Sequence, residues 1–89
     1  MYLEEEYGDA LDSMIYQIKM LIAFNQQKVE EIEENYKNAA DSINEHYSSA
    51  HPLHIQLNLL MAHIFYHLDP NQGLTYSNQA LKLSLSIYG

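Results

Sequence analysis

The chain has 89 residues, 47% of them hydrophobic, a formal net charge of −8 and no cysteine, which indicates one small domain without disulfide or thiolate chemistry. The chain has twelve acidic residues and only four basic ones, all of them lysine. Proteins that bind nucleic acid or anionic membranes need a basic surface, so both functions are excluded. Any charged partner is expected to be basic.

Residues 1–8 are predicted to form an acidic lead or a short first turn that ends at Gly8. Asp9 or Asp12 is predicted to cap the helix that follows, because a carboxylate there accepts hydrogen bonds from free backbone N–H groups. The start of the chain lacks the positive charge of a signal peptide, and Gln, Asn and His interrupt its apolar segments. We therefore expect a soluble, cytoplasmic protein.

The segment from Ala10 to Ala50 contains neither glycine nor proline. Its apolar residues recur at alternating steps of four and three, and the series passes in phase through the polar Asn25-Gln26-Gln27. A tight turn ordinarily shifts such a phase. We therefore predict one continuous helix over residues 10–48. The alternative is a turn near Gln26 that divides the segment into two helices and closes a four-helix bundle.

A central helix is predicted over residues 53–68, opened by Pro52 and capped by Ser48, Ser49 or His51. It is apolar nearly all round, which requires neighbours on most of its circumference. Asp69 as cap and Pro70 in the first turn begin a C-terminal helix over residues 71–88, which lies antiparallel to the central one. The predicted fold class is all-α, an antiparallel helical array in which one long helix is followed by a helical hairpin.

The polar residues of the central helix, Gln56, His63 and His67, fall in one narrow stripe. This stripe is either the wall of a binding groove or the wet side of the helix. His63 and His67 have the four-residue spacing that lets two imidazoles bind one zinc ion, but a stable site needs further ligands, and the sequence offers none at a suitable spacing. We expect no metal, with His51 as a helix cap and His54 as a packed or edge histidine.

Catalytic chemistry is not expected. Nothing in the sequence places Ser13, Ser42, Ser77 or Ser86 beside an activating histidine, and there is no glycine-rich phosphate loop. We therefore expect a protein that is not an enzyme and that binds no cofactor.

Three stretches together resemble the C-terminal half of the 14-3-3 proteins over residues 14–88. The stretches are Ile15-Tyr16-Gln17-Ile18-Lys19-Met20, Tyr36-Lys37-Asn38-Ala39 fifteen residues before His51, and the segment from His51-Pro52 to Phe65-Tyr66-His67-Leu68. This resemblance implies an antiparallel helical scaffold that binds peptides.

The second half of the chain also resembles tetratricopeptide repeats of the kinesin-light-chain kind. The features shared with those repeats are the opening His51-Pro52, the small Ala62 near the middle of a helix, and a following helix that reads Asn78-Gln79-Ala80-Leu81-Lys82-Leu83. Both families are stacks of antiparallel helices that bind peptides, so the expected architecture is the same for either.

The 14-3-3 resemblance also implies candidate groove residues. Lys19 matches the lysine of the family's phosphate pocket, whereas the pocket's arginine and tyrosine fall on Gln26 and Gln27. The family's peptide-binding asparagine falls on Leu60, which lies in the stripe of Gln56, His63 and His67. One lysine does not make a phosphate pocket. We therefore expect phosphorylated peptides to bind no better than unphosphorylated ones.

Three functional hypotheses follow. The first is a non-enzymatic protein-interaction module, a shortened 14-3-3-like scaffold without most phosphate-reading residues, which binds a protein or peptide partner. The second is a tetratricopeptide-type adaptor fragment that binds peptides or stacks on further repeats. The third is a small histidine-based metal-binding or catalytic protein. A homodimer through the long first helix is expected, because two short helices cover less than half of its length.

Overall fold

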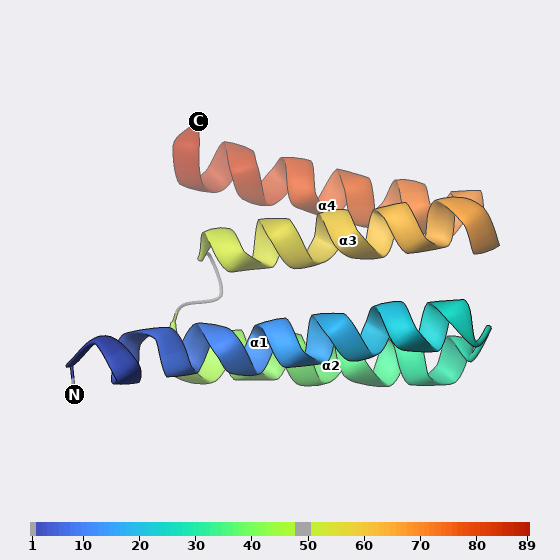
Figure 1. Ribbon diagram of the computed structural model, residues 1–89. Helices are drawn as coiled ribbons and strands as arrows, with labels where there is room; N and C mark the ends of the chain where they lie inside the picture. The colour runs from blue at the N-terminus through green and yellow to red at the C-terminus, as the bar shows by residue number, and fades with distance from the viewer. Residues whose placement is uncertain (1, 48–50) are drawn as a thin grey trace. The chain divides into compact units, whose positions relative to one another are not determined.

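The computed structural model describes residues 2–47 and 51–89, and these residues form four α-helices and no strand. The helices are α1 (Tyr2–Asn25), α2 (Val29–His46), α3 (Pro52–Leu68) and α4 (Pro70–Tyr88). α1 packs against α2, and α3 packs against α4, as two antiparallel hairpins (Figure 1). Each hairpin is a compact unit of its own. The predicted all-α class is confirmed.

The helix α1 begins earlier than the sequence analysis predicted. It starts at Tyr2, so residues 2–8 are helical rather than a lead, and Asp9 and Asp12 lie inside the helix rather than at its N-cap. Gly8 disfavours the helix by only about 1 kcal/mol relative to alanine, so it does not end it.

The continuous helix predicted over residues 10–48 is wrong, because the chain turns between Asn25 and Val29. Lys28 N–H donates to Ala23 O at 2.9 Å, and Gln27 N–H donates to Phe24 O at 3.0 Å. This pair of hydrogen bonds is the Schellman motif that ends many helices. Its left-handed position is usually glycine, but here it is Gln27, with φ of 59°. The alternative, a turn near Gln26, is confirmed.

The apolar residues that recur at alternating steps of four and three continue across this turn without a change of spacing. They nevertheless do not form one continuous helix face. Three of the α1 members of this series are about half exposed, and these are Ile15 (49%), Ile18 (54%) and Ile22 (50%). Three of its α2 members are buried, and these are Ile32 (0%), Ala39 (0%) and Ile43 (1%), whereas Val29 is 38% exposed and Tyr36 is half-buried. The side of α1 that is buried carries Ser13, Met20 and Ala23 instead. An unbroken phase therefore misled the prediction, since each half of the series belongs to a different helix face.

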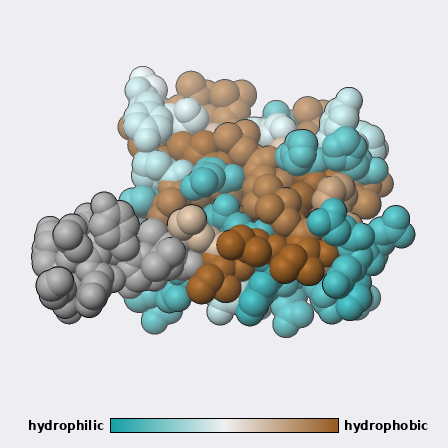
Figure 2. All heavy atoms as spheres, in the orientation of Figure 1, coloured by the Kyte–Doolittle hydropathy of each residue, from teal (hydrophilic) through white to brown (hydrophobic). Residues whose placement is uncertain are grey.

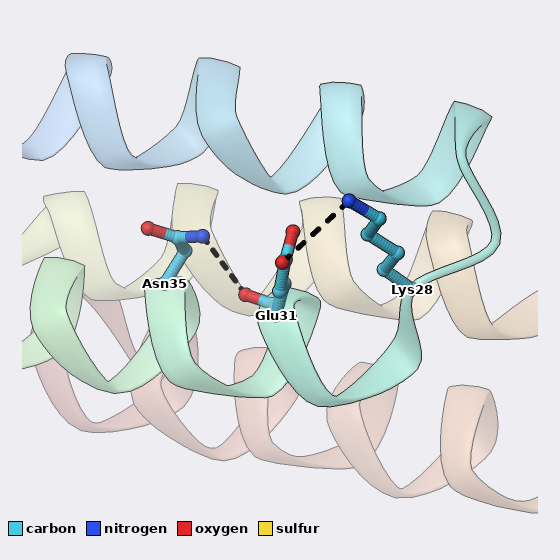
Figure 3. Close-up of polar contacts among 3 residues, drawn as sticks. All are labelled: Lys28, Glu31 and Asn35. Carbon is cyan, nitrogen blue, oxygen red and sulfur yellow. Dashed lines mark hydrogen bonds and ion pairs between the residues drawn. The ribbon is translucent and has the colours of Figure 1, made fainter.

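The start of α2 is held without a capping side chain, because its N-cap residue is Lys28. The Lys28 ammonium lies 3.8 Å from a Glu31 carboxylate oxygen, and Asn35 Nδ2 donates to the Glu31 carbonyl at 2.9 Å (Figure 3). Both ends of the ion pair are about half exposed, so the pair contributes at most a few tenths of a kcal/mol. Glu30 and Glu31 also complement the helix dipole.

Both helices of the second hairpin start with the predicted caps. His51 Nδ1 accepts from Leu53 N–H at 3.1 Å, and Asp69 Oδ1 accepts from Asn71 N–H at 3.2 Å. Pro52 and Pro70 occupy the first helical positions, where their missing N–H groups cost nothing. Asp69 alone joins α3 to α4, because it is the C-cap of one helix and the N-cap of the other.

The α3–α4 hairpin packs closely at small residues. Gly73 of α4 is buried, and a Cβ built on it lies 3.0 Å from Tyr66 N and 3.1 Å from Ala62 O. Alongside, the Phe65 ring stacks on Tyr76 with 5.7 Å between centroids. The close approach of backbone and the ring contact together fix how α4 lies on α3.

Candidate binding surfaces

The four predicted groove residues of α3 (Gln56, Leu60, His63 and His67, hereafter the α3 stripe) share one side of that helix. Gln56, His63 and His67 are exposed, and Leu60 is half-buried. The His63 and His67 rings meet edge to face with centroids 5.5 Å apart. The stripe therefore presents imidazole and amide groups to solvent from a rigid helix.

Two apolar side chains that the sequence analysis did not select flank the α3 stripe. Leu59 is 53% exposed and Tyr66 is 69% exposed. The Tyr66 and His67 rings meet edge to face, with 5.4 Å between their centroids. The expectation that α3 needs cover on most of its circumference therefore fails on this side. The reason is that α3 buries one broad arc with seven residues and leaves the opposite arc open. The buried residues are His54, Leu57, Asn58, Met61, Ala62, Ile64 and Phe65.

The other three predicted groove residues belong to the first hairpin. Lys19 is exposed on α1, with its ammonium 5.5 Å from the centroid of the Tyr16 ring. Gln26 and Gln27 form the turn after α1, and both are exposed. In the turn, Gln27 has a structural role as the left-handed residue. The predicted groove residues are thus divided between the two hairpins.

A polar pocket between α1 and α2 was not predicted from the sequence. Its volume is about 220 Å³, and its lining residues are Asp12, Tyr16, Asn38, Asp41, Ser42, Glu45 and His46. Three of them are carboxylates, so the pocket suits a cationic group better than an anion. The signal in the sequence is the spacing of three and four along α2, which places Asn38, Asp41, Ser42 and Glu45 on one face.

Among residues 2–47 and 51–89, no group of three or more His, Cys, Asp or Glu side chains could hold a metal ion. His63 and His67 thus form a pair without a third protein ligand in the described part of the chain. A stable zinc site takes three or four protein ligands.

An exposed apolar surface lies on α1 and is made by Met14, Ile15, Ile18, Leu21 and Ile22, hereafter the α1 face. These side chains are 40–54% exposed and recur at helical spacing on the side of α1 opposite its buried residues. In Figure 2 a band of apolar residues runs along the front of the molecule over α1. Between Asp12 and Asn25 the only charged residues are Asp12 and Lys19, so the helix is nearly neutral there.

His54 is a buried histidine, only 7% exposed, and its carbonyl accepts from Asn58 Nδ2 at 2.8 Å. Burial lowers the pKa of His54 below its ordinary value of 6.5, and the nearby His51 charge lowers it further. The prediction of a packed histidine is therefore confirmed. The imidazole stays neutral in the fold under conditions in which an unfolded chain would protonate it.

We expect this burial to make the fold sensitive to acid. As the pH falls below 6.5, the unfolded chain binds a proton at His54 before the folded chain does. The stability contributed by the neutral imidazole is present above pH 6.5 and is lost as the pH falls through the lowered folded pKa. Thermal unfolding at pH 7.5 and 5.5 should show this loss in the wild type and not in His54→Leu.

The exposed His63 supplies the control for this experiment. His63→Gln should keep the acid-dependent loss of the wild type, because its side chain lies in solvent. An acid response of His54→Leu equal to that of the wild type would show that other groups cause it.

None of the described helices combines the length and the apolar character needed to cross a membrane. Comparisons with protein-family models, curated proteins and solved structures give no match to this chain. The resemblances to the 14-3-3 proteins and to tetratricopeptide repeats stay predictions from sequence.

Proposed function

We propose that this chain is a non-enzymatic helical protein-interaction module that binds an amphipathic helix of a partner protein through the α1 face. The observation that supports this is the exposure of five large apolar side chains, each 40% or more, on one side of one helix. An exposed contiguous apolar patch on a small protein marks an interaction site or an aggregation hazard.

The apolar spacing of α1 and the net charge of the whole chain define the kind of partner. Its apolar residues follow helical spacing, which matches a partner helix whose own apolar side chains recur at i, i+3, i+4 and i+7. The net charge of −8 attracts a partner with basic residues beside its apolar ones. The partner proposed here is thus a basic amphipathic helix.

Two single-residue variants of α1 distinguish binding through the α1 face from binding through a 14-3-3-like groove. Ile18→Gln removes an apolar side chain that is 54% exposed, and Lys19→Gln removes the neighbouring exposed lysine while introducing the same side chain. Proteins captured by the wild type are identified, and a peptide from each captured protein is titrated against all three chains. We expect at least tenfold weaker binding for Ile18→Gln, equivalent to about 1.4 kcal/mol, and little change for Lys19→Gln.

The reverse result would contradict the α1 face. Binding that is lost in Lys19→Gln and retained in Ile18→Gln would favour a groove built around the lysine, as the 14-3-3 resemblance implies. Unchanged binding in both variants would place the partner elsewhere, with the α3 stripe as the next surface to change.

The second candidate function is a tetratricopeptide-type adaptor fragment. The observation in its favour is the close approach of Gly73 to the backbone at Ala62, because Ala62 is the small mid-helix residue on which the resemblance to these repeats rests. A homodimer through the first helix was predicted from a long uncovered helix, and the turn at Gln26–Lys28 removes that reason. The exposed α1 face would be the contact surface of such a dimer.

A further inference from the structure

A second exposed row lies on α4 and follows a coiled-coil pattern. Steps of four, three, four and three residues separate its members, which are Leu74, Asn78, Leu81, Leu85 and Tyr88, hereafter the α4 row. Its four large apolar members are 58–70% exposed, more than any side chain of the α1 face, and Asn78 is exposed as well. This spacing is that of the a and d positions of a heptad, with Asn78 and Leu85 at a.

The opposite side of α4 is already packed on α3. Gly73 and Ala80 are buried, and Tyr76 stacks on Phe65. α4 is therefore folded before any partner arrives, and little conformational entropy remains to be lost when its row is covered. An isolated helix of two heptads lacks this advantage.

The charge of α4 points to the identity of the partner. The helix contains a single charged residue, Lys82, and no carboxylate, although the whole chain carries −8. Two copies of an acidic protein repel each other wherever their acids approach. A helix without acids is a surface on which two copies can meet with little of that repulsion.

We propose that a second copy of this chain binds through the α4 row, as a parallel two-stranded coiled coil in which Asn78 faces Asn78 of the second copy. In a parallel pair related by a twofold axis, identical positions lie opposite each other, so the two amides can hydrogen-bond across the interface. In an antiparallel pair, Asn78 would face an apolar d residue and lose its partner. A single asparagine at an a position is known to fix register and the two-stranded state.

The size of the row indicates a weak dimer rather than a permanent one. Four large side chains at 58–70% exposure present roughly 400 Å² per copy, which lies within the usual size of a functional patch. Two copies bury roughly 800 Å² between them, which is below the size of permanent interfaces and typical of weak, reversible ones. The dimer is therefore expected to form in the micromolar range and to dissociate on dilution.

Sedimentation equilibrium of the whole chain between about 5 and 500 µM tests the proposal. The wild type should show a mass that rises from monomer to dimer with concentration. Leu81→Glu should stay monomeric or dimerise at least tenfold more weakly, while Gln79→Glu should behave as the wild type. The control adds the same charge to α4 at an exposed position outside the row.

Cross-linking tests the orientation and does not depend on the folding of a charged variant. The chain contains no cysteine, so Asn78→Cys introduces a single thiol. Under mild oxidation Asn78→Cys should form a disulfide-linked dimer rapidly, because identical a positions lie opposite each other in the parallel pair. Gln79→Cys, which lies outside the row about 100° round the helix from Asn78, should form such a dimer at least tenfold more slowly.

Each other result overturns the proposal. A wild type that stays monomeric at 500 µM has no such dimer. A dimer unaffected by Leu81→Glu uses a different surface, and the α1 face is then the first to examine. A Leu81→Glu monomer that melts well below Gln79→Glu would show that the row is covered within the chain itself. Equal cross-linking of the two cysteine variants would exclude the parallel register.

Discussion

Replacing Phe65 by alanine should lower the free energy of unfolding by about 3–5 kcal/mol, the range found for large aromatic residues removed from protein cores. Phe65 is 2% exposed and stacks on Tyr76 across the α3–α4 hairpin. Alanine loses both the burial and the ring contact and leaves a cavity between the two helices. For a chain of this size, the melting temperature should fall by more than about 10 °C. Urea unfolding followed by circular dichroism measures the loss.

The adjacent Tyr66 is the matched control for this variant. It is an aromatic residue on the same helix, but 69% exposed, so Tyr66→Ala should change the free energy of unfolding by no more than about 0.5 kcal/mol. Equal losses in the two variants would contradict the orientation of α3, because they would mean that the side carrying Tyr66 is buried as well.

Substitutions of Gly73 should also destabilise the hairpin, even though alanine is the better helix former. Alanine gains about 0.8–1 kcal/mol of helix propensity. Its Cβ, however, would lie 3.0–3.3 Å from three backbone atoms of α3, and backbone cannot rotate away. Overpacking of this kind costs about 1–3 kcal/mol, so the clash wins. Gly73→Leu should lie at the upper end of this range, and Gly73→Ala should show a smaller net loss.

Variants of Gln72, which is exposed and adjacent to Gly73, separate the effect of helix propensity from the effect of packing against α3. Gln72→Ala and Gln72→Leu introduce the same side chains at an exposed position, so both should leave the stability unchanged or raise it slightly. Chemical denaturation of the four variants gives the comparison. A Gly73→Ala variant about 1 kcal/mol more stable than the wild type would show that α4 can move away from α3 at no cost.

The second hairpin was predicted from the sequence almost completely, because its signals are local. His51 and Asp69 cap their helices through contacts two residues away, and Pro52 and Pro70 mark the helix starts on steric grounds. Such contacts depend on neighbours along the chain and need no knowledge of the tertiary fold.

The first hairpin was predicted wrongly because its turn depends on tertiary packing. A left-handed glutamine costs about 1–2 kcal/mol, and no local residue compensates for it. The burial of Met20 and Ile32 in the finished hairpin stabilises the turn by more than this, at about 1.5–3 kcal/mol for each fully buried side chain. A pattern that lists only apolar positions cannot show which of two faces will be buried.

The candidate surfaces were predicted unevenly for the same reason. The α3 stripe was found because polar residues stand out on an apolar helix. Leu59 and Tyr66 beside it were missed, since an apolar residue is assigned to the core unless its neighbours are known. The polar pocket was missed because Asp12 and Asp41 lie on different helices, and only the α1–α2 turn brings their helices into one hairpin.

The single-residue junction at Asp69 makes the chain intolerant of length changes. Its N–H donates to Phe65 O at 2.7 Å and its carboxylate caps α4, so both helices are anchored at one point. One inserted residue would rotate α4 by about 100° about its own axis. Gly73 would leave its contact with Ala62, and the larger Gln72 would take its place against α3. Evolution can therefore vary the residues exposed on this hairpin freely, but it can add or remove residues only at its ends.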